Sequence, residues 1–244
     1  MNLRRDYRPT PSSISAIAGA IASASFAVGD VLLLGKRATP DDRRLLREQE
    51  DVHPSAATLM AVGPQRSRAG ALFGVIAAPL HVVSAWSIYD ALSPGGTRRA
   101  ARVAGTYAAA MAWVGYIHGT FYPWAAAFNA ADRAEPGSTQ RAEALAEASR
   151  IERSIEIPYT AFALIGGAAA LETTALVALG KSRFPRWAAP LVTPLAPTAA
   201  VIAATRVLPA KPGHVVSGAS LSLGMLAANA AAAWIRRRPE SAAE

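Results

Sequence analysis

The sequence predicts an all-α integral membrane bundle of about six transmembrane helices. Of the 244 residues, 52% are hydrophobic and only 17% are charged, whereas a soluble domain usually carries about 25% charged residues. The charges occur in short clusters between long uncharged stretches. Such alternation is typical of a chain that crosses a membrane several times.

The formal net charge of +8 does not indicate nucleic-acid binding, because no basic stripe with interleaved aromatic residues is present. The arginines lie where the predicted membrane helices end, so we expect anionic lipid headgroups to be their partners. The chain has no cysteine, which excludes disulfides, thiolate metal sites and a cysteine nucleophile.

The first predicted span covers residues 14–35, after a polar and basic N-terminal segment. A signal peptide with a cleavage site at Ala22-Ser23-Ala24 is the alternative, but the apolar run continues past that site. Residues 40–51 follow as a short exposed polar helix, with a threonine cap and a proline in the first turn. The second span, residues 69–92, has Pro79 and His81 near its centre.

The third span, residues 103–130, carries a polar stripe. At about 100° per residue, one face of the helix collects five side chains, which are those of Tyr107, Met111, His118, Tyr122 and Asn129. His118 lies near the middle of the span, where hydrocarbon would leave its ring nitrogens without partners. We therefore expect this face to turn toward other helices or a cavity.

Residues 138–150 are predicted to form a second exposed polar helix, and residues 157–180 the fourth span. Glu172 is predicted to be the deepest acid in the chain. The fifth span, residues 187–207, contains three prolines and should be kinked or partly unwound. The sixth, residues 214–235, places Asn229 on a face of small residues that favours close helix packing.

Six spans would put both termini on one side of the membrane. The lysines and arginines are divided almost equally, 12 on that side against 13 on the other, so their count does not decide the orientation. Because every short connection on the terminal side is basic, we expect a multi-pass cell-membrane protein with cytoplasmic termini. Short matches between the two halves also allow an inverted repeat.

Ionisable side chains within membrane spans are costly and are candidates for function by default. Four were identified as candidate catalytic residues: Asp30, His81, His118 and Glu172. A carboxyl group in a dry interior can hold a proton at neutral pH, and a neighbouring histidine can accept one. Each residue also has a structural interpretation, as a helix cap, an interhelical hydrogen-bond partner or a partner for backbone freed by a proline.

Several catalytic motifs are absent. The chain has no HExxH, GxSxG, phosphate-binding glycine loop or DDxxD-like acidic cluster. A zinc protease, an α/β-hydrolase, a P-loop ATPase and chemistry that begins with diphosphate ionisation are therefore not expected. We expect no metal and no cofactor.

Three short motifs, Gly29-Asp30 before an aliphatic run, His118-Gly119 and Phe184-Pro185-Arg186-Trp187, resemble those of a family of small bacterial multi-span membrane proteins, a domain of unknown function. The resemblance covers nearly the whole chain and implies no activity. In architecture alone, the predicted bundle is also similar to membrane-bound isoprenoid cyclases and sterol isomerases.

The first functional hypothesis is an enzyme that acts on a lipophilic, isoprenoid- or sterol-like substrate. Glu172 or Asp30 would donate a proton and a histidine would accept one. The residues expected to bind the substrate are Trp86, Trp113, Tyr122, Trp124, Asn129 and Asn229. A proton-coupled transporter or channel is the alternative, and a membrane scaffold without chemistry is the third possibility.

Overall fold

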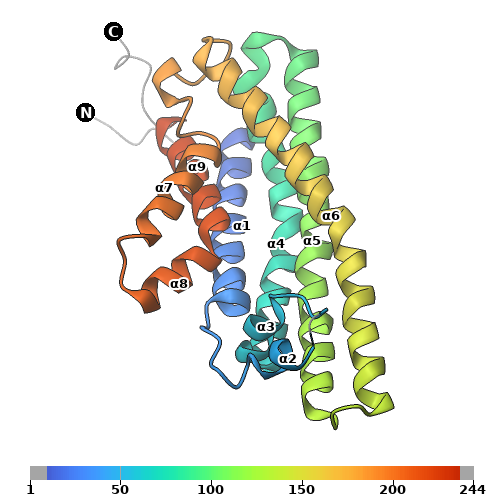
Figure 1. Ribbon diagram of the computed structural model, residues 1–244. Helices are drawn as coiled ribbons and strands as arrows, with labels where there is room; N and C mark the ends of the chain where they lie inside the picture. Colours follow the sequence, from blue (N-terminus) through green and yellow to red (C-terminus); the bar gives the residue numbers. More distant parts are fainter. Residues whose placement is uncertain (1–9, 50, 237–244) are drawn as a thin grey trace, which may run out of the picture.

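The computed structural model describes residues 10–49 and 51–236, and within these residues all regular structure is helical. Four long helices lie side by side: α1 (Pro11–Leu34), α4 (Pro64–Leu92), α5 (Thr97–Arg133) and α6 (Thr139–Ala178) (Figure 1). A C-terminal group of α7 (Leu195–Thr205), α8 (Ala210–Gly218) and α9 (Ser220–Arg236) packs against α1. The predicted all-α class is confirmed.

Three described helices are long and apolar enough to cross a membrane, within Pro11–Leu34, Pro64–Gly95 and Thr139–Ala178. The pair α8 and α9, bent by 70° at their junction, makes a fourth if it is one broken span. The predicted count of six is therefore not confirmed. Helix α5 is 37 residues long, but it is not among the helices that meet this criterion.

The predicted fifth span is interrupted. Residues 186–188 form a 3-10 turn (η2, Arg186–Ala188), and an irregular segment leads into α7, which is only 11 residues long. The interruption coincides with Pro190 and Pro194, which cannot donate the backbone hydrogen bonds that a continuous helix needs. The sequence had indicated such a break.

The predicted exposed helix at 138–150 and the predicted fourth span are one continuous helix, α6, of 40 residues. Ser138 caps its start by accepting a hydrogen bond from the backbone N–H of Arg141. No glycine lies between residues 150 and 157, and Pro158 is accommodated inside the helix. The expected boundary between the two elements was therefore wrong.

The segment expected to be an exposed helix at 40–51 contains only α2 (Arg44–Glu48), and residue 50 lies outside the described residues. Leu45 of α2 is fully buried. Together with α3 (Ala56–Val62), it joins a core formed by the ends of α5 and α6 that includes Phe128 and Ile155. The segment packs against this core through the apolar side chain of Leu45. The charged residues around Leu45 made the segment look exposed in the sequence.

Large apolar side chains cover the outer surface of the long helices, including Ile14 and Ile21 of α1, Ile76 of α4, and Ile157 and Leu164 of α6. Such an outer surface is compatible with lipid and unusual for a soluble protein. The basic residues Arg4, Arg5 and Arg8, which entered the orientation argument, lie outside the described residues.

Helices α1 and α4 approach each other through glycine. A Cβ atom on Gly70 would lie 2.8 Å from the carbonyl oxygen of Gly29 and 2.7 Å from Leu33 Cγ. Gly105, an exposed residue of α5, has open space at the same position. The α1–α4 crossing therefore has no room for a side chain at Gly70.

We predict that Gly70→Ala destabilises the protein by about 1–3 kcal/mol, as overpacking of a close contact does. Gly105→Ala is the matched control and should be neutral or stabilising, because alanine favours helix over glycine by about 1 kcal/mol. Unfolding of the purified variants in detergent checks this. Equal stability of the two variants would show that α1 and α4 do not meet at Gly70.

Candidate functional site

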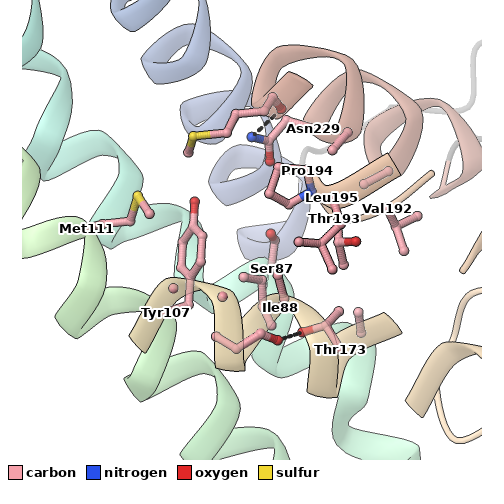
Figure 2. Close-up of a pocket in the computed structure, with 18 of the residues that line it drawn as sticks. Ser87, Ile88, Tyr107, Met111, Thr173, Val192, Thr193, Pro194, Leu195 and Asn229 are labelled. Atoms are coloured by element: carbon pink, nitrogen blue, oxygen red, sulfur yellow. Dashed lines mark hydrogen bonds between the residues drawn. The ribbon is translucent and has the colours of Figure 1, made fainter. Parts of the chain in front are cut away.

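A cavity of about 310 Å³ lies between α4, α5, α6, α9 and the irregular segment at residues 192–195 (Figure 2). Apolar side chains such as Ile88, Met111, Phe162 and Met225 form most of its wall. The polar side chains on the wall are few, and come from Ser87, Tyr107, Thr173, Thr193, Asn229 and Arg236. An apolar pocket with a few placed polar groups is the usual form of a small-molecule site.

Tyr107 connects this wall to a buried histidine. Its hydroxyl oxygen lies 2.9 Å from Nδ1 of His81 and 3.3 Å from the hydroxyl of Ser84. The His81 side chain is fully buried and is not among the residues that line the cavity. His81 is therefore connected to the cavity through Tyr107.

Ser23 of α1 joins this pair to α9. Its hydroxyl donates to the carbonyl oxygen of Gly19 at 2.9 Å and accepts from the amide nitrogen of Asn229 at 2.9 Å. The Nε2 atom of His81 lies 3.5 Å away. Because the only hydroxyl proton of Ser23 is already donated, Ser23 can only accept from His81.

These hydrogen bonds of Ser23 assign the tautomer of His81. Nε2 carries the proton and points it at Ser23, so Nδ1 is an acceptor and receives the hydroxyl proton of Tyr107. The Ser84 hydroxyl donates to the His81 carbonyl oxygen at 2.6 Å. With its proton donated to His81 and that of Ser84 donated elsewhere, the Tyr107 oxygen is free to accept a hydrogen bond from a group in the cavity.

Asp30, His118 and Ser222 form a second polar cluster. The Oδ1 atom of Asp30 lies 3.8 Å from Nε2 of His118, and the hydroxyl of Ser222 donates to Oδ2. His118 is buried, as its position in the sequence indicated, and its Nδ1 has no hydrogen-bond partner. None of the three residues lines the cavity.

Phe26 separates the two clusters. Its ring stacks on His118 with centroids 5.0 Å apart and an interplanar angle of 10°. It also contacts the ring of His81, with centroids 4.7 Å apart. A phenyl ring offers no site that can carry a proton, so His81 and His118 belong to two separate polar clusters.

Glu172 is not the deep acid that its position in the sequence suggested. It bonds to Arg99 at 2.9 Å and to Arg102 at 2.5 Å, and a quarter of its side chain is exposed. Both arginines lie near the start of α5, which neighbours the end of α6. The prediction for Glu172 was wrong because the hydropathy of one helix does not show which charged side chains a neighbouring helix places beside it.

Only one of the expected substrate-binding residues, Asn229, lines the cavity. The side chains of Trp86, Trp113 and Tyr122 are exposed. Trp124 is buried in the core beside α2 and α3, away from the cavity lining. Asn129 donates to the carbonyl oxygen of Ala125 in its own helix. Sequence position alone could not separate outward-facing aromatic residues from inward-facing ones.

Neither Tyr107 nor Ser23 was among the residues predicted to be catalytic or substrate-binding. Tyr107 was placed on the polar stripe of the third span together with Met111, and both line the cavity. The stripe was therefore the signal that could have identified Tyr107. Ser23 lies in a run of small residues, and nothing in that run distinguishes it from its neighbours.

Arg236 forms a further polar group of the cavity wall. It donates to the backbone carbonyl of Ser87, lies 3.3 Å from Oδ2 of Asp90 and stacks over the Phe184 ring at 5.2 Å. These contacts hold the end of α9 against α4. Among the described residues, no group of three or more His, Cys, Asp or Glu side chains could hold a metal ion.

The chain was compared with known proteins. Residues 10–238 match the family described as "Family of unknown function (DUF6796)". No match was found among the curated proteins or among the solved structures.

We predict that His81 carries its proton on Nε2. In protein with ¹⁵N-labelled histidine, the His81 signals should show a protonated Nε2 and an unprotonated Nδ1, and Tyr107→Phe should shift the Nδ1 resonance most. His81→Gln assigns the signals. A protonated Nδ1 in the unaltered protein would contradict the direction of the hydrogen bonds around Ser23.

Proposed function

We propose a function for this chain from the contacts described above. The chain belongs to the family of unknown function (DUF6796), and membership of that family implies no activity. We propose that it binds a lipophilic small molecule with a hydroxyl group in the cavity, and that Tyr107 and His81 carry out proton transfer on it. An isomerase or cyclase of isoprenoid-like molecules is the reaction class that this chemistry fits.

One observation carries the proposal, namely the hydrogen-bonded pair of Tyr107 and His81 at the wall of an apolar cavity. An alcohol in the cavity would donate its hydroxyl proton to the free lone pair of Tyr107. The tyrosine proton would move to Nδ1 of His81, while Nε2 keeps its hydrogen bond to Ser23. If the proton then returns to one carbon of a double bond in the same molecule while the alcohol oxygen bonds to the other carbon, the ligand closes to a cyclic isomer. Tyr107 and His81 then regain their starting protonation, so the pair serves as both base and acid.

The size of the cavity supports a small ligand. About 310 Å³ is at the lower end of the range for small-molecule pockets, which is about 300–1,000 Å³. Compact isoprenoid alcohols therefore suit it better than a complete sterol. Since Asp30 and Glu172 are not among the residues lining the cavity, we no longer assign either of them to direct proton donation.

We further propose that the protein lies in the cell membrane with cytoplasmic termini and exchanges its ligand with the surrounding lipid. Three or four helices have the required length and composition, and their exposed faces are apolar. A ligand that dissolves in lipid could then reach the cavity without crossing water.

A transporter is the second candidate, favoured by the irregular backbone beside the cavity. Thr193 and Pro194 line it in the irregular segment just before α7, and Leu221 lines it just after the 70° bend between α8 and α9. Broken helices at a binding site are a feature of many secondary transporters. Uptake of the bound alcohol into proteoliposomes under a pH gradient would distinguish transport from catalysis.

We predict that Tyr107→Phe weakens the binding of a lipophilic alcohol by up to about tenfold, the loss expected for one hydrogen bond of 0.5–1.5 kcal/mol. Binding of a labelled isoprenoid alcohol to the purified protein in nanodiscs checks this. Tyr116→Phe is the matched control, because that hydroxyl bonds to Ser154 outside the cavity. The corresponding hydrocarbon should bind both variants and the unaltered protein alike.

The same preparations test for catalysis. If the protein is an isomerase or cyclase, labelled alcohols should be converted to new products, and His81→Gln should remove that conversion while leaving part of the binding. Absence of binding for every alcohol tested, or equal losses in the Tyr107 and Tyr116 variants, would contradict the proposed site.

A further inference from the structure

The cluster of Asp30, His118 and Ser222 has no part in the proposed chemistry, yet it joins three helices. Asp30 lies on α1, His118 on α5 and Ser222 on α9. The two ionisable side chains are mostly buried, with 16% of Asp30 and 8% of His118 exposed. A buried acid next to a buried histidine is costly to maintain, so its place between the helices requires an explanation.

The charges around Asp30 leave His118 as its nearest ionisable partner. From α4, Arg66 donates to the carbonyl oxygens of Val31 and Leu32 at the end of α1. From α6, Tyr159 interacts electrostatically with Asp30. Helix α8 carries Lys211 and His214; neither has a described ion pair with Asp30.

The His118 ring has little freedom to find another partner. A methyl group on Gly74 would overlap the ring at Cγ and Nδ1, and the ring also stacks on Phe26. Its Nδ1 has no hydrogen-bond partner, while Nε2 is the nitrogen that faces Asp30, at 3.8 Å. The ring is therefore held close to Asp30.

We propose that Asp30 and His118 form a proton-binding site, and that uptake of one proton loosens the start of α9. Without the proton, the pair has one negative charge on Asp30, and the hydrogen bond from Ser222 is charge-assisted and strong. With the proton on the Asp30 carboxyl group, that group is neutral, and the hydrogen bond from Ser222 is weaker.

The position of Ser222 connects this site to the cavity. Ser222 follows the bend between α8 and α9 at Ala219 by three residues. From that bend onward, α9 contributes Leu221, Met225 and Asn229 to the cavity wall. A change in the Ser222 bond therefore acts on the end of the helix that forms one wall of the cavity.

The absence of cysteine in the chain allows a direct test with a spin label on Leu221→Cys in nanodiscs. Between about pH 8 and pH 5, the label should become more mobile in one transition with the slope of a single proton. Asp30→Asn and His118→Gln should each remove the transition, and Glu147→Gln, an exposed acid paired with Arg150, should keep it. A label on Leu171→Cys of α6 should show no transition.

Two further measurements remain informative if a variant does not fold. In the unaltered protein with ¹⁵N-labelled histidine, the His118 resonances should titrate over the same pH range as the label. Ser222→Ala should keep that titration and uncouple it from the label. The proposal is overturned if the label shows no transition in the unaltered protein, if the transition persists in both Asp30→Asn and His118→Gln, or if the His118 resonances do not shift over that pH range. None of these results depends on ligand binding.

Discussion

The hydroxyl of Ser23 is the interaction on which the interior of this bundle depends. It donates within α1, accepts from Asn229 of α9 and faces the Nε2 atom of His81 of α4. Through His81 it fixes the direction of the hydrogen bond from Tyr107 of α5. One oxygen atom thus orders polar groups from four helices. In a low-dielectric interior each of these groups would be costly without its partner.

Small residues make this arrangement possible. A Cβ atom on Gly19 would lie 2.9 Å from both Oδ1 of Asn229 and Cβ of Ser84, so α1 admits these side chains only because Gly19 has none. Gly74 does the same for His118. In a membrane, where the hydrophobic effect does not drive helices together, close packing and interhelical hydrogen bonds are the available forces. The glycines therefore allow the close helix packing that brings the polar side chains within hydrogen-bond distance of one another.

The sequence was most informative where the physical constraint is local. Charge clustering and apolar length predicted the helical class, and the prolines near residue 190 predicted the interruption of the fifth span. The buried position of His118 also followed, because the middle of an apolar helix excludes an unpaired ring. Tyr107 and Met111, two residues of the predicted polar stripe, line the cavity.

The remaining features depend on which helices become neighbours, and no local pattern encodes that. Glu172 was predicted to be deeply buried, but it pairs with Arg99 and Arg102 at the start of α5. Phe26, one apolar residue among many, contacts both histidines only because α1 packs against the helix bundle at that level. Trp86 and Trp113 were expected to bind substrate because aromatic faces stabilise cations, but their helices turn them outward.

The occupancy of the cavity is the central claim, and photolabelling with a lipophilic alcohol that carries a diazirine tests it most directly. We expect the label on peptides containing Met111 and Met225, which line the cavity, and we expect an excess of unlabelled alcohol to displace it. Label confined to outward-facing side chains such as Ile157 and Leu171, and not displaced by the alcohol, would show that the protein contacts the molecule only as lipid and would contradict the account.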